Sequence, residues 1–218
     1  MNNIKDEWKT IINNYSNINK LNEFIESIYV NNEIYPKYSK IFNCFEHFNY
    51  SETKIVILGQ DPYYNADIAT GLCFGINNGG IPPSLKNIIK ELKNSCNIEL
   101  KDYTLEKWAK QNILLLNSAL TVQKNKPLSH TKFWYDFTKY IIKKLNQLDN
   151  IIFVAWGAHA HKILEDIDTT KHNIIISSHP SPLSANKKYK NFPSFLGSNT
   201  FLKINDLLKQ NNKTLIEW

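Results

Sequence analysis

Short apolar segments alternate along the chain with amphipathic segments of helical spacing, and this alternation constrains the fold more than any other feature. The apolar segments are Lys54–Leu58, Ile113–Leu116, Ile151–Trp156 and Asn173–Ser177, and each has the length of a buried strand. Strands separated by helices form right-handed crossovers and therefore a parallel sheet. Because apolar strands of this kind need cover on both faces, the sequence predicts an α/β fold, a three-layer α/β/α sandwich with a central four-stranded parallel sheet.

The expected helices each show one apolar face. We expect Ser84 to cap the first helix of the α/β part, a short helix to start near Ala158, and the segment 1–50 to be helical as well. The apolar faces comprise Leu85, Ile88, Ile89 and Leu92; Phe137, Tyr140, Ile141, Leu145 and Leu148; Phe201, Ile204, Leu207 and Leu208; and, near the N-terminus, Leu21, Phe24, Ile25, Ile28, Ile41, Phe45 and Phe48.

The size of the chain favours one domain, spanning residues 1–218, with 1–50 as its helical N-terminal part. No apolar run approaches the roughly 20 residues of a membrane span. The start, Met1 to Glu7, lacks an apolar signal region, and the three cysteines are odd in number and widely spaced. We therefore expect an intracellular protein, in the cytoplasm of a prokaryote, the nucleus or a viral replication site, that is not secreted and contacts no membrane.

The net charge of +6 hints at a polyanionic partner. All 26 basic residues are Lys, because the sequence contains no Arg. Any phosphate must therefore be bound by Lys, by hydroxyls or by backbone N–H groups.

Small and polar residues follow every predicted strand. The first strand leads into Gly59–Tyr64, the second into Asn117, the third into Gly157–Ala158 and the fourth into Ser178–Ser184. Ligands of open parallel sheets bind outside the carboxyl ends of the strands, so a carboxylate, an amide and an imidazole should converge at one edge. Each motif alone is as easily a turn or a cap. Together they predict a site.

Four motifs closely resemble those of family 1 uracil-DNA glycosylases. They are Gly59-Gln60-Asp61-Pro62-Tyr63, Gly71-Leu72-Cys73-Phe74, Leu114-Leu115-Leu116-Asn117 and His179-Pro180-Ser181-Pro182-Leu183-Ser184. The resemblance extends from about Trp8 to Trp218. It implies a DNA repair enzyme that flips deoxyuridine out of DNA and hydrolyses its N-glycosidic bond, releasing uracil and leaving an abasic site. It implies no metal and no organic cofactor.

The resemblance assigns the chemistry to Asp61 and His179. Breaking the bond puts positive charge on the sugar and negative charge on the departing uracil. Asp61 would stabilise the first charge and position the attacking water, and a neutral His179 would donate a hydrogen bond to uracil O2.

Recognition of the base is assigned to four other residues. Asn117 would pair with uracil O4 and N3–H, a pattern that cytosine reverses. Phe74 would stack on the flipped ring, and Tyr63 would stand against C5, where thymine carries a methyl group. Gln60 would lie in the same pocket wall.

Three segments resemble those that compress the DNA backbone in the family. They are Pro82-Pro83-Ser84, Gly157-Ala158 and the run from Ser181 to Ser184, and they offer hydroxyls and backbone N–H groups to phosphates. Leu183 resembles the apolar wedge that fills the gap left by the flipped nucleotide. The family usually has His where this chain has Tyr64, and Ser where it has Ala158. These departures should affect DNA affinity more than chemistry.

The segment Ala185–Leu196 is longer than the usual family form. Lys187, Lys188 and Lys190 alternate there with aromatic residues, a pattern that suits a loop tracking phosphates beside the flipped nucleotide. The alternative is a solvated flap that Phe192 and Phe195 anchor to the core.

Two further functions compete with uracil excision. One is a non-catalytic DNA-binding or replication-accessory protein on the same fold, which would not need Asp61, Asn117 and His179 together. The other is a glycosylase of broader lesion range, against which Tyr63 argues. The expected partners are uracil-containing DNA, single- or double-stranded, and a uracil-mimicking inhibitor protein, with the chain acting as a monomer.

Several other patterns predict no site. Cys44 and His47 have half the spacing of a metal site, and no second half follows. His159 and His161 are two residues apart on an expected helix and would not face each other.

Overall fold

A computed structural model describes residues 3–218 and has a four-stranded parallel sheet at its centre. The strands are β2 (Ile55–Gly59), β3 (Ile113–Asn117), β5 (Ile152–Trp156) and β6 (Asn173–Ser177), arranged in the order β3-β2-β5-β6. Every residue of β2, β3 and β5 is buried, as expected of strands covered on both faces. The predicted fold class is confirmed, with strand bounds that differ from the prediction by at most one residue.

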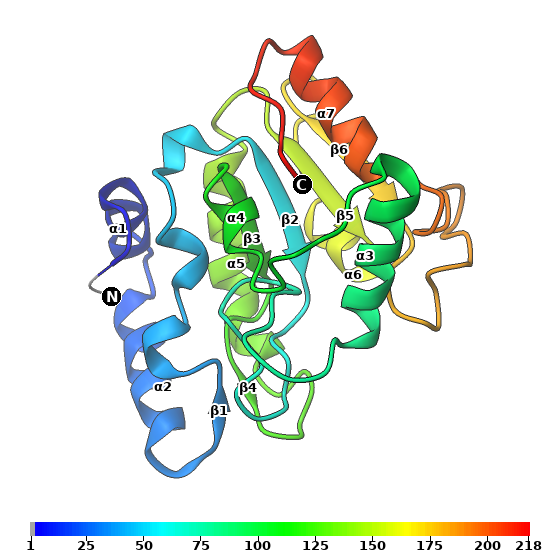
Figure 1. Ribbon diagram of the computed structural model, residues 1–218. Helices are drawn as coiled ribbons and strands as arrows, with labels where there is room; N and C mark the ends of the chain where they lie inside the picture. Colours follow the sequence, from blue (N-terminus) through cyan, green and yellow to red (C-terminus); the bar gives the residue numbers. More distant parts are fainter. Residues whose placement is uncertain (1–2) are drawn as a thin grey trace.

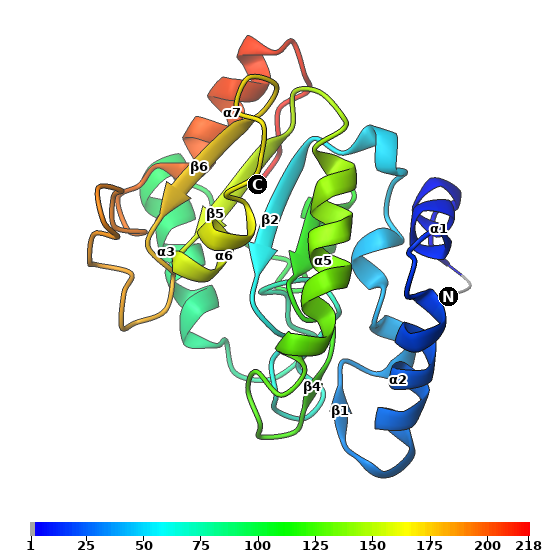
Figure 2. The same cartoon turned by 180° about the vertical axis from the view of Figure 1, so that it is seen from behind.

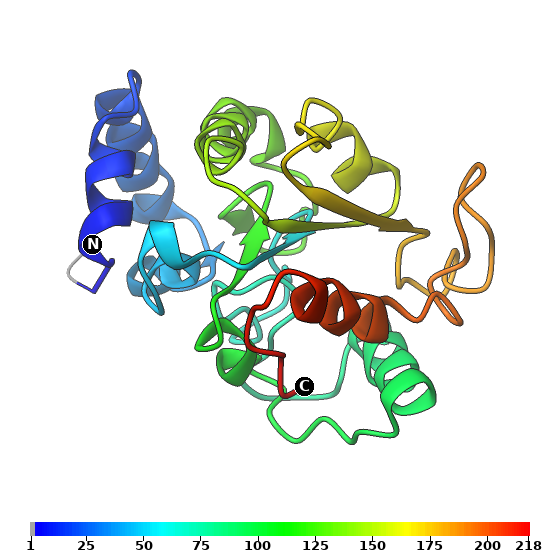
Figure 3. The ribbon, with the colours of Figure 1, turned by 90° about the horizontal axis from the view of Figure 1, so that it is seen from above.

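Helices cover both faces of this sheet (Figures 1 and 2). Helices α5 (Thr131–Leu145) and α6 (Ala158–Ile163) lie on one face. Helices α3 (Pro83–Cys96) and α7 (Thr200–Gln210) lie on the other, where the short α4 (Glu106–Ala109) also packs near β3. The view from above shows the sheet between these two helical layers (Figure 3).

The N-terminal part begins with α1 (Asp6–Asn13) and α2 (Ile18–Asn31), which stand beside α5 (Figure 3). The hydroxyl of Tyr140 on α5 donates to Ile11 O at 2.9 Å, and the ring of Tyr15 meets that of Phe137 edge-on at 5.4 Å. Both contacts join α1 and the turn after it to α5.

The prediction of helices throughout residues 1–50 is wrong after Asn31. Strand β1 (Ile34–Tyr35) pairs antiparallel with β4 (Val122–Gln123), and three single 3-10 turns follow: η1 (Tyr38–Lys40), η2 (Asn43–Phe45) and η3 (Tyr50–Glu52). Pro36 lacks an N–H group and cannot continue a helix. The apolar residues that suggested a helix are nevertheless buried, since short turns also carry Ile41, Phe45 and Phe48 into the core.

The start of α3 also differs from the prediction. The helix begins at Pro83 and its N-cap residue is Pro82, so Ser84 lies inside the first turn and makes no capping hydrogen bond. Proline favours this place because its fixed φ suits the helix and its missing N–H would be unpaired there anyway. A further difference concerns α5. Leu148 was expected on its apolar face but lies after the helix has ended at Leu145.

One cluster of buried apolar side chains extends from Ile4 to Ile216. Trp8 on α1 and Trp156 on β5 both belong to it, and neither is more than 1% exposed. Residues 1 and 2 of the predicted domain lie outside the described residues. Within residues 3–218, no helix is both long enough and apolar enough to cross a membrane.

Candidate active site

The carboxyl ends of the strands bring the predicted residues to one edge of the sheet. Gly59 at the end of β2 is level with Asn117 at the end of β3, and Asp61 follows two residues later. A side chain at position 59 would overlap with Asn117 Oδ1, so only glycine lets the buried amide lie against the strand.

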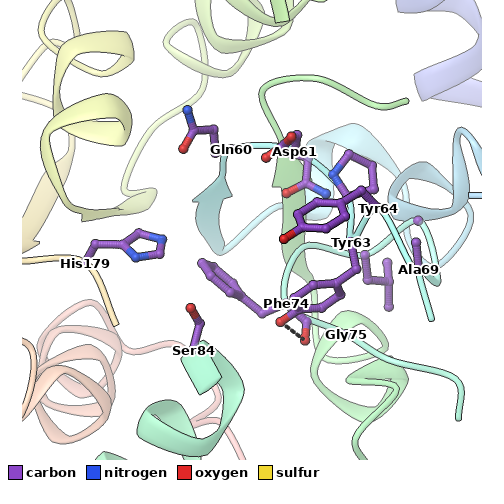
Figure 4. Close-up of a pocket in the computed structure, with 13 residues that line it drawn as sticks. Gln60, Asp61, Tyr63, Tyr64, Ala69, Phe74, Gly75, Ser84 and His179 are labelled. Carbon is purple, nitrogen blue, oxygen red and sulfur yellow. Dashed lines mark hydrogen bonds between the residues drawn. The ribbon is translucent and has the colours of Figure 1, made fainter. Parts of the chain in front are cut away.

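A pocket of about 200 Å³ opens at this edge. Residues from separate stretches of the chain line it, among them Tyr63, Phe74 and His179 (Figure 4). Its lining residues are Gln60, Asp61, Pro62, Tyr63, Tyr64, Ala69, Gly71, Leu72, Phe74, Gly75, Ser84, Asn117 and His179. Both predicted catalytic residues and all four predicted base-binding residues therefore line one cavity.

The hydrogen bonding of His179 defines where its proton lies. The backbone N–H of Ser181 donates to His179 Nδ1 at 3.0 Å, so this nitrogen carries a lone pair. Burial, and then the nearby charge of His159, lower the pKa of His179 below its ordinary value of 6.5. The ring is therefore neutral at pH 7, and its single proton is on Nε2, where it is available for donation.

Asp61 is in a different environment. Its Oδ2 accepts a hydrogen bond of 2.8 Å from the backbone N–H of Leu128, in the segment between β4 and α5. Burial raises the pKa of Asp61 above 3.8, while this hydrogen bond and the charge of His159 act in the opposite direction. The same pocket is thus lined by a partly desolvated carboxylate and by a neutral imidazole.

An aromatic wall completes the pocket. Phe74 has a left-handed backbone, with φ of 63°, and its ring lies 5.4 Å from Trp156 and 6.0 Å from His179. The hydroxyl of Tyr63 reaches Phe74 O at 3.5 Å (Figure 4). A planar ligand can stack on Phe74 with Tyr63 at its edge and Asn117 at its polar side.

Comparisons with known proteins identify the family. A model of the uracil DNA glycosylase superfamily matches residues 45–208. The uracil-DNA glycosylase of Flavobacterium johnsoniae is 40% identical over 218 residues, which cover 97% of this chain and 96% of that protein. The chain belongs to the uracil DNA glycosylase superfamily.

Solved structures agree with this assignment. The crystal structure of mimivirus uracil-DNA glycosylase matches with a TM-score of 0.87 and 34% identity, over 98% of this chain and 86% of that one. A variant of the mimivirus enzyme has been solved in complex with UGI, and it matches with a TM-score of 0.87 and 34% identity over 98% of this chain and 88% of that one.

The predicted backbone-compressing segments of this superfamily member lie around the pocket. Pro82 is half-buried and Pro83 exposed, while Ser84 lines the cavity itself. Gly157 has φ of 92°, and a Cβ there would come within 2.9 Å of His179 Cβ. Glycine at this position therefore lets the end of β5 approach the histidine, with the exposed Ala158 next to it.

The segment that carries Leu183 is a closed turn. The N–H of Ser184 donates to Ser181 O at 3.0 Å, the two hydroxyls lie 2.9 Å apart, and Ser184 Oγ donates to His179 O at 3.0 Å. Leu183 itself is 82% exposed. Its side chain therefore lies largely in solvent.

The long segment after this turn is folded rather than loose. Tyr189 and Phe192 form a β-bridge, and their rings stack at 6.1 Å while both meet the ring of His161 on α6. Phe195 is fully buried against Trp156. The expected anchoring by Phe195 is thus observed, and Phe192 packs instead on His161.

The three lysines Lys187, Lys188 and Lys190 of this segment are exposed on the loop, which projects beyond the β6 edge of the sheet (Figure 3). Their contact with DNA stays a prediction.

Sequence reasoning missed two contributors to the site. The backbone N–H of Leu128 donates to the Asp61 carboxylate, and no pattern of side chains in the sequence predicts such a contact. His159 bonds to Ser118 beside Asn117 and influences both Asp61 and His179, whereas His161 turns to Tyr189. The position of His159, three residues after the end of the third parallel strand at Trp156, was the available signal.

Proposed function

We propose that this superfamily member hydrolyses the N-glycosidic bond of deoxyuridine in DNA, releasing uracil and leaving an abasic site. The observation that carries the proposal is the single pocket in which Asp61, neutral His179, Asn117 and the face of Phe74 meet. A base must leave the duplex to enter such a pocket, as glycosylases in general require.

Asp61 and His179 act on the two charges that develop as the bond breaks. The Asp61 carboxylate stabilises the positive sugar and orients the water that attacks it. His179 donates its Nε2 proton in a hydrogen bond to uracil O2, where negative charge collects. Both groups are set in place before the substrate arrives, so they favour the transition state without reorganisation.

Base selection resides in the pocket wall. Asn117 donates to uracil O4 and accepts from N3–H, and cytosine would leave this buried amide unpaired. Tyr63 excludes the thymine methyl group, Phe74 stacks on the ring and Gln60 closes the side of the pocket. Asn117 is only 5% exposed, so a base that leaves its amide without a hydrogen-bond partner binds at a high cost.

The DNA strand is bound through the three segments around the pocket. The start of α3, with Pro82, Pro83 and Ser84, and the start of α6, with Gly157 and Ala158, offer a hydroxyl and backbone N–H groups to phosphates. Leu183 fills the space that the flipped nucleotide vacates, and its exposure supports this role.

The turn serines and the loop lysines extend this DNA surface. Ser181 and Ser184 bind phosphate beside the wedge. Lys187, Lys188 and Lys190 neutralise further phosphates along the strand.

We further infer that the chain works as a single domain and a monomer, on uracil-containing DNA inside the cell. The mimivirus complex supports the inhibitor protein UGI as a partner. Because UGI would occupy the DNA-binding face, an excess of it should stop the reaction.

One assay tests the proposal. The protein is incubated with a uracil-containing oligonucleotide in a metal chelator, and abasic sites are then cleaved with alkali. We expect cleavage at the uracil position by the wild type. Asp61→Asn and His179→Leu should each lower the single-turnover rate on the order of 10² or more, with DNA binding retained.

The exposed Asp67 offers a matched control, and Asp67→Asn should cleave like the wild type. DNA binding without cleavage by the wild type would favour the non-catalytic alternative. Loss of activity in chelator would contradict the metal-free mechanism.

A further inference from the structure

His159 lines a second, smaller cavity beside the active-site pocket. This cavity has a volume of about 170 Å³, and the two cavities share Gln60 and His179 as lining residues. His159 is half-buried on α6, directly after the Gly157–Ala158 segment. The same cavity is lined by Gly157 and Ala158, the proposed phosphate contact, and by His179.

A chain of hydrogen bonds connects His159 to the segment that carries Asp61. His159 Nε2 lies 2.7 Å from Ser118 Oγ, and Ser118 Oγ donates to Gln60 O at 2.7 Å. A carbonyl oxygen only accepts, so the hydroxyl proton is directed at Gln60. Ser118 Oγ must then accept from His159, which fixes the proton of the neutral ring on Nε2.

Ser118 is held from the backbone as well. Its N–H donates to Gly59 O at 3.0 Å, and its carbonyl accepts from Thr138 Oγ1 at 2.7 Å. Among the hydrogen bonds of residues 3–218, the one to His159 alone links Ser118 to α6. Through Ser118, the imidazole thus connects the turn from Gln60 into Asp61 to helix α6, and we call this connection the brace.

A second proton would make His159 positive, and the neighbouring titratable groups would respond to this charge. Burial lowers the pKa of His159 below 6.5, so the ring gains this proton only on the acid side of that value; the charge of Asp61, after β2, raises the pKa, and Lys162 on its own helix lowers it. The charge of His159 acts in turn on His179, after β6. A positive His159 attracts the Asp61 carboxylate and opposes a proton on His179. In line with this, the charge of His159 lowers the pKa of both Asp61 and His179.

We propose that His159 is a positioning residue of this active site: it braces the Gln60–Asp61 turn through Ser118 and, when protonated, keeps Asp61 ionised and His179 neutral. The inference rests on the proposed function, since these are the two ionisation states that uracil excision requires. Neither role involves contact with the base or with the reacting atoms.

Two variants separate the brace from the charge. In His159→Gln, the side-chain amide can still donate to Ser118 Oγ, but it does not titrate. In His159→Ala, both the hydrogen bond and the charge are lost. Each variant is compared with the wild type by the single-turnover rate of uracil release at saturating enzyme, from about pH 5 to about pH 8, the range in which histidine titrates.

The expected signs follow from the states that the reaction needs. Excision is lost as the pH falls through the pKa of Asp61 or of His179, whichever is higher. Below its own lowered pKa His159 carries a positive charge, and without that charge the pKa values of Asp61 and His179 both rise. In His159→Gln the fall should therefore begin at a higher pH than in the wild type. His159→Ala should share this shift and also lose roughly tenfold in rate at high pH, the loss of one hydrogen bond to a partner that stays buried.

His161→Gln is the matched control, a histidine on the same helix whose ring contacts Tyr189 and Phe192 instead. Its fall in rate should begin at the wild-type pH. A His159→Gln profile that coincides with the wild type would overturn the charge role, and equal high-pH rates for the Ala and Gln variants would overturn the brace. Thermal unfolding reports whether His159→Ala is folded, and His159→Gln alone still decides the charge role. A wild type that releases no uracil would refute the proposed function instead.

Discussion

Asp61 and His179 line one pocket, and burial there shifts their pKa values in opposite directions. Burial opposes charge on both, raising the pKa of the carboxyl and lowering that of the imidazole. For His179 this favours the required neutral form. For Asp61 it opposes the required form, and the N–H of Leu128 compensates by donating to the carboxylate. His179 is therefore kept neutral chiefly by burial, with the charge of His159 acting in the same direction, while Asp61 depends on a hydrogen bond from a neighbouring loop.

Substrate selectivity should change with single side chains. Tyr63→Ala opens space at the edge of the base, and should admit thymine weakly because one methyl group accounts for only about 1–3 kcal/mol of discrimination. Asn117→Asp should shift tolerance towards cytosine, since a carboxylate accepts from the cytosine amino group. Release of base from oligonucleotides containing T or C measures both effects. Undiminished uracil selectivity in both variants would show that the pocket residues are misassigned.

The loop element after Leu183 should contribute to DNA affinity through charge. Replacing Lys187, Lys188 and Lys190 by Ala should weaken binding to all sequences and reduce the log–log salt slope by roughly 2–3 units, if each lysine neutralises one phosphate of duplex DNA. The single-turnover rate at saturating enzyme should change little. Lys5, Lys9 and Lys20, all exposed in the N-terminal part, provide a control of equal charge. A salt slope equal in wild type and loop variant would leave the loop as a solvated flap.

Helix α3 holds the far end of this loop through a buried carboxylate. Glu91 is fully buried and accepts from the N–H groups of Gly197 at 2.7 Å and Asn199 at 2.8 Å, just before α7. Glu91→Ala leaves both donors without their partner, and should lower the free energy of unfolding by about 3 kcal/mol or more. Lys90→Ala, one residue away and exposed, should change it by less than about 0.5 kcal/mol. Urea denaturation compares the two, and similar midpoints would mean that water replaces the carboxylate.

Elements were predictable where one local signal determines them. The strands were located because short apolar runs of this length are buried on both faces, as Ile113–Asn117 is. The segment after Asn31 was not, because burial of Ile41 and Phe45 looks the same in a helix and in 3-10 turns. The residues of the site were likewise predictable only where a local sequence signal determines them. Consecutive motif residues were found, whereas Leu128 and His159 reach it through contacts between distant elements.

At the scale of the molecule, the N-terminal helices share the core of the sandwich. Trp8 is fully buried, with its ring 4.9 Å from Phe45 and 5.3 Å from Tyr50. Trp8→Ala should therefore cost about 3–5 kcal/mol of global stability. Circular dichroism and tryptophan fluorescence should report one shared, lowered unfolding midpoint. An early separate transition, with the sheet unaffected, would show instead that the N-terminal part is a unit of its own.

Folding and function place different demands on the exposed Leu183. Its turn is closed by hydrogen bonds among His179, Ser181 and Ser184, and the leucine side chain adds almost nothing to the folded core. Folding thus makes little use of the Leu183 side chain, which leaves it available for the proposed contact with DNA. This one position can be exchanged for larger, smaller or polar residues without a stability penalty. If Leu183 is the proposed wedge, substitutions there should change how long the protein stays at an abasic product and leave its folding unchanged.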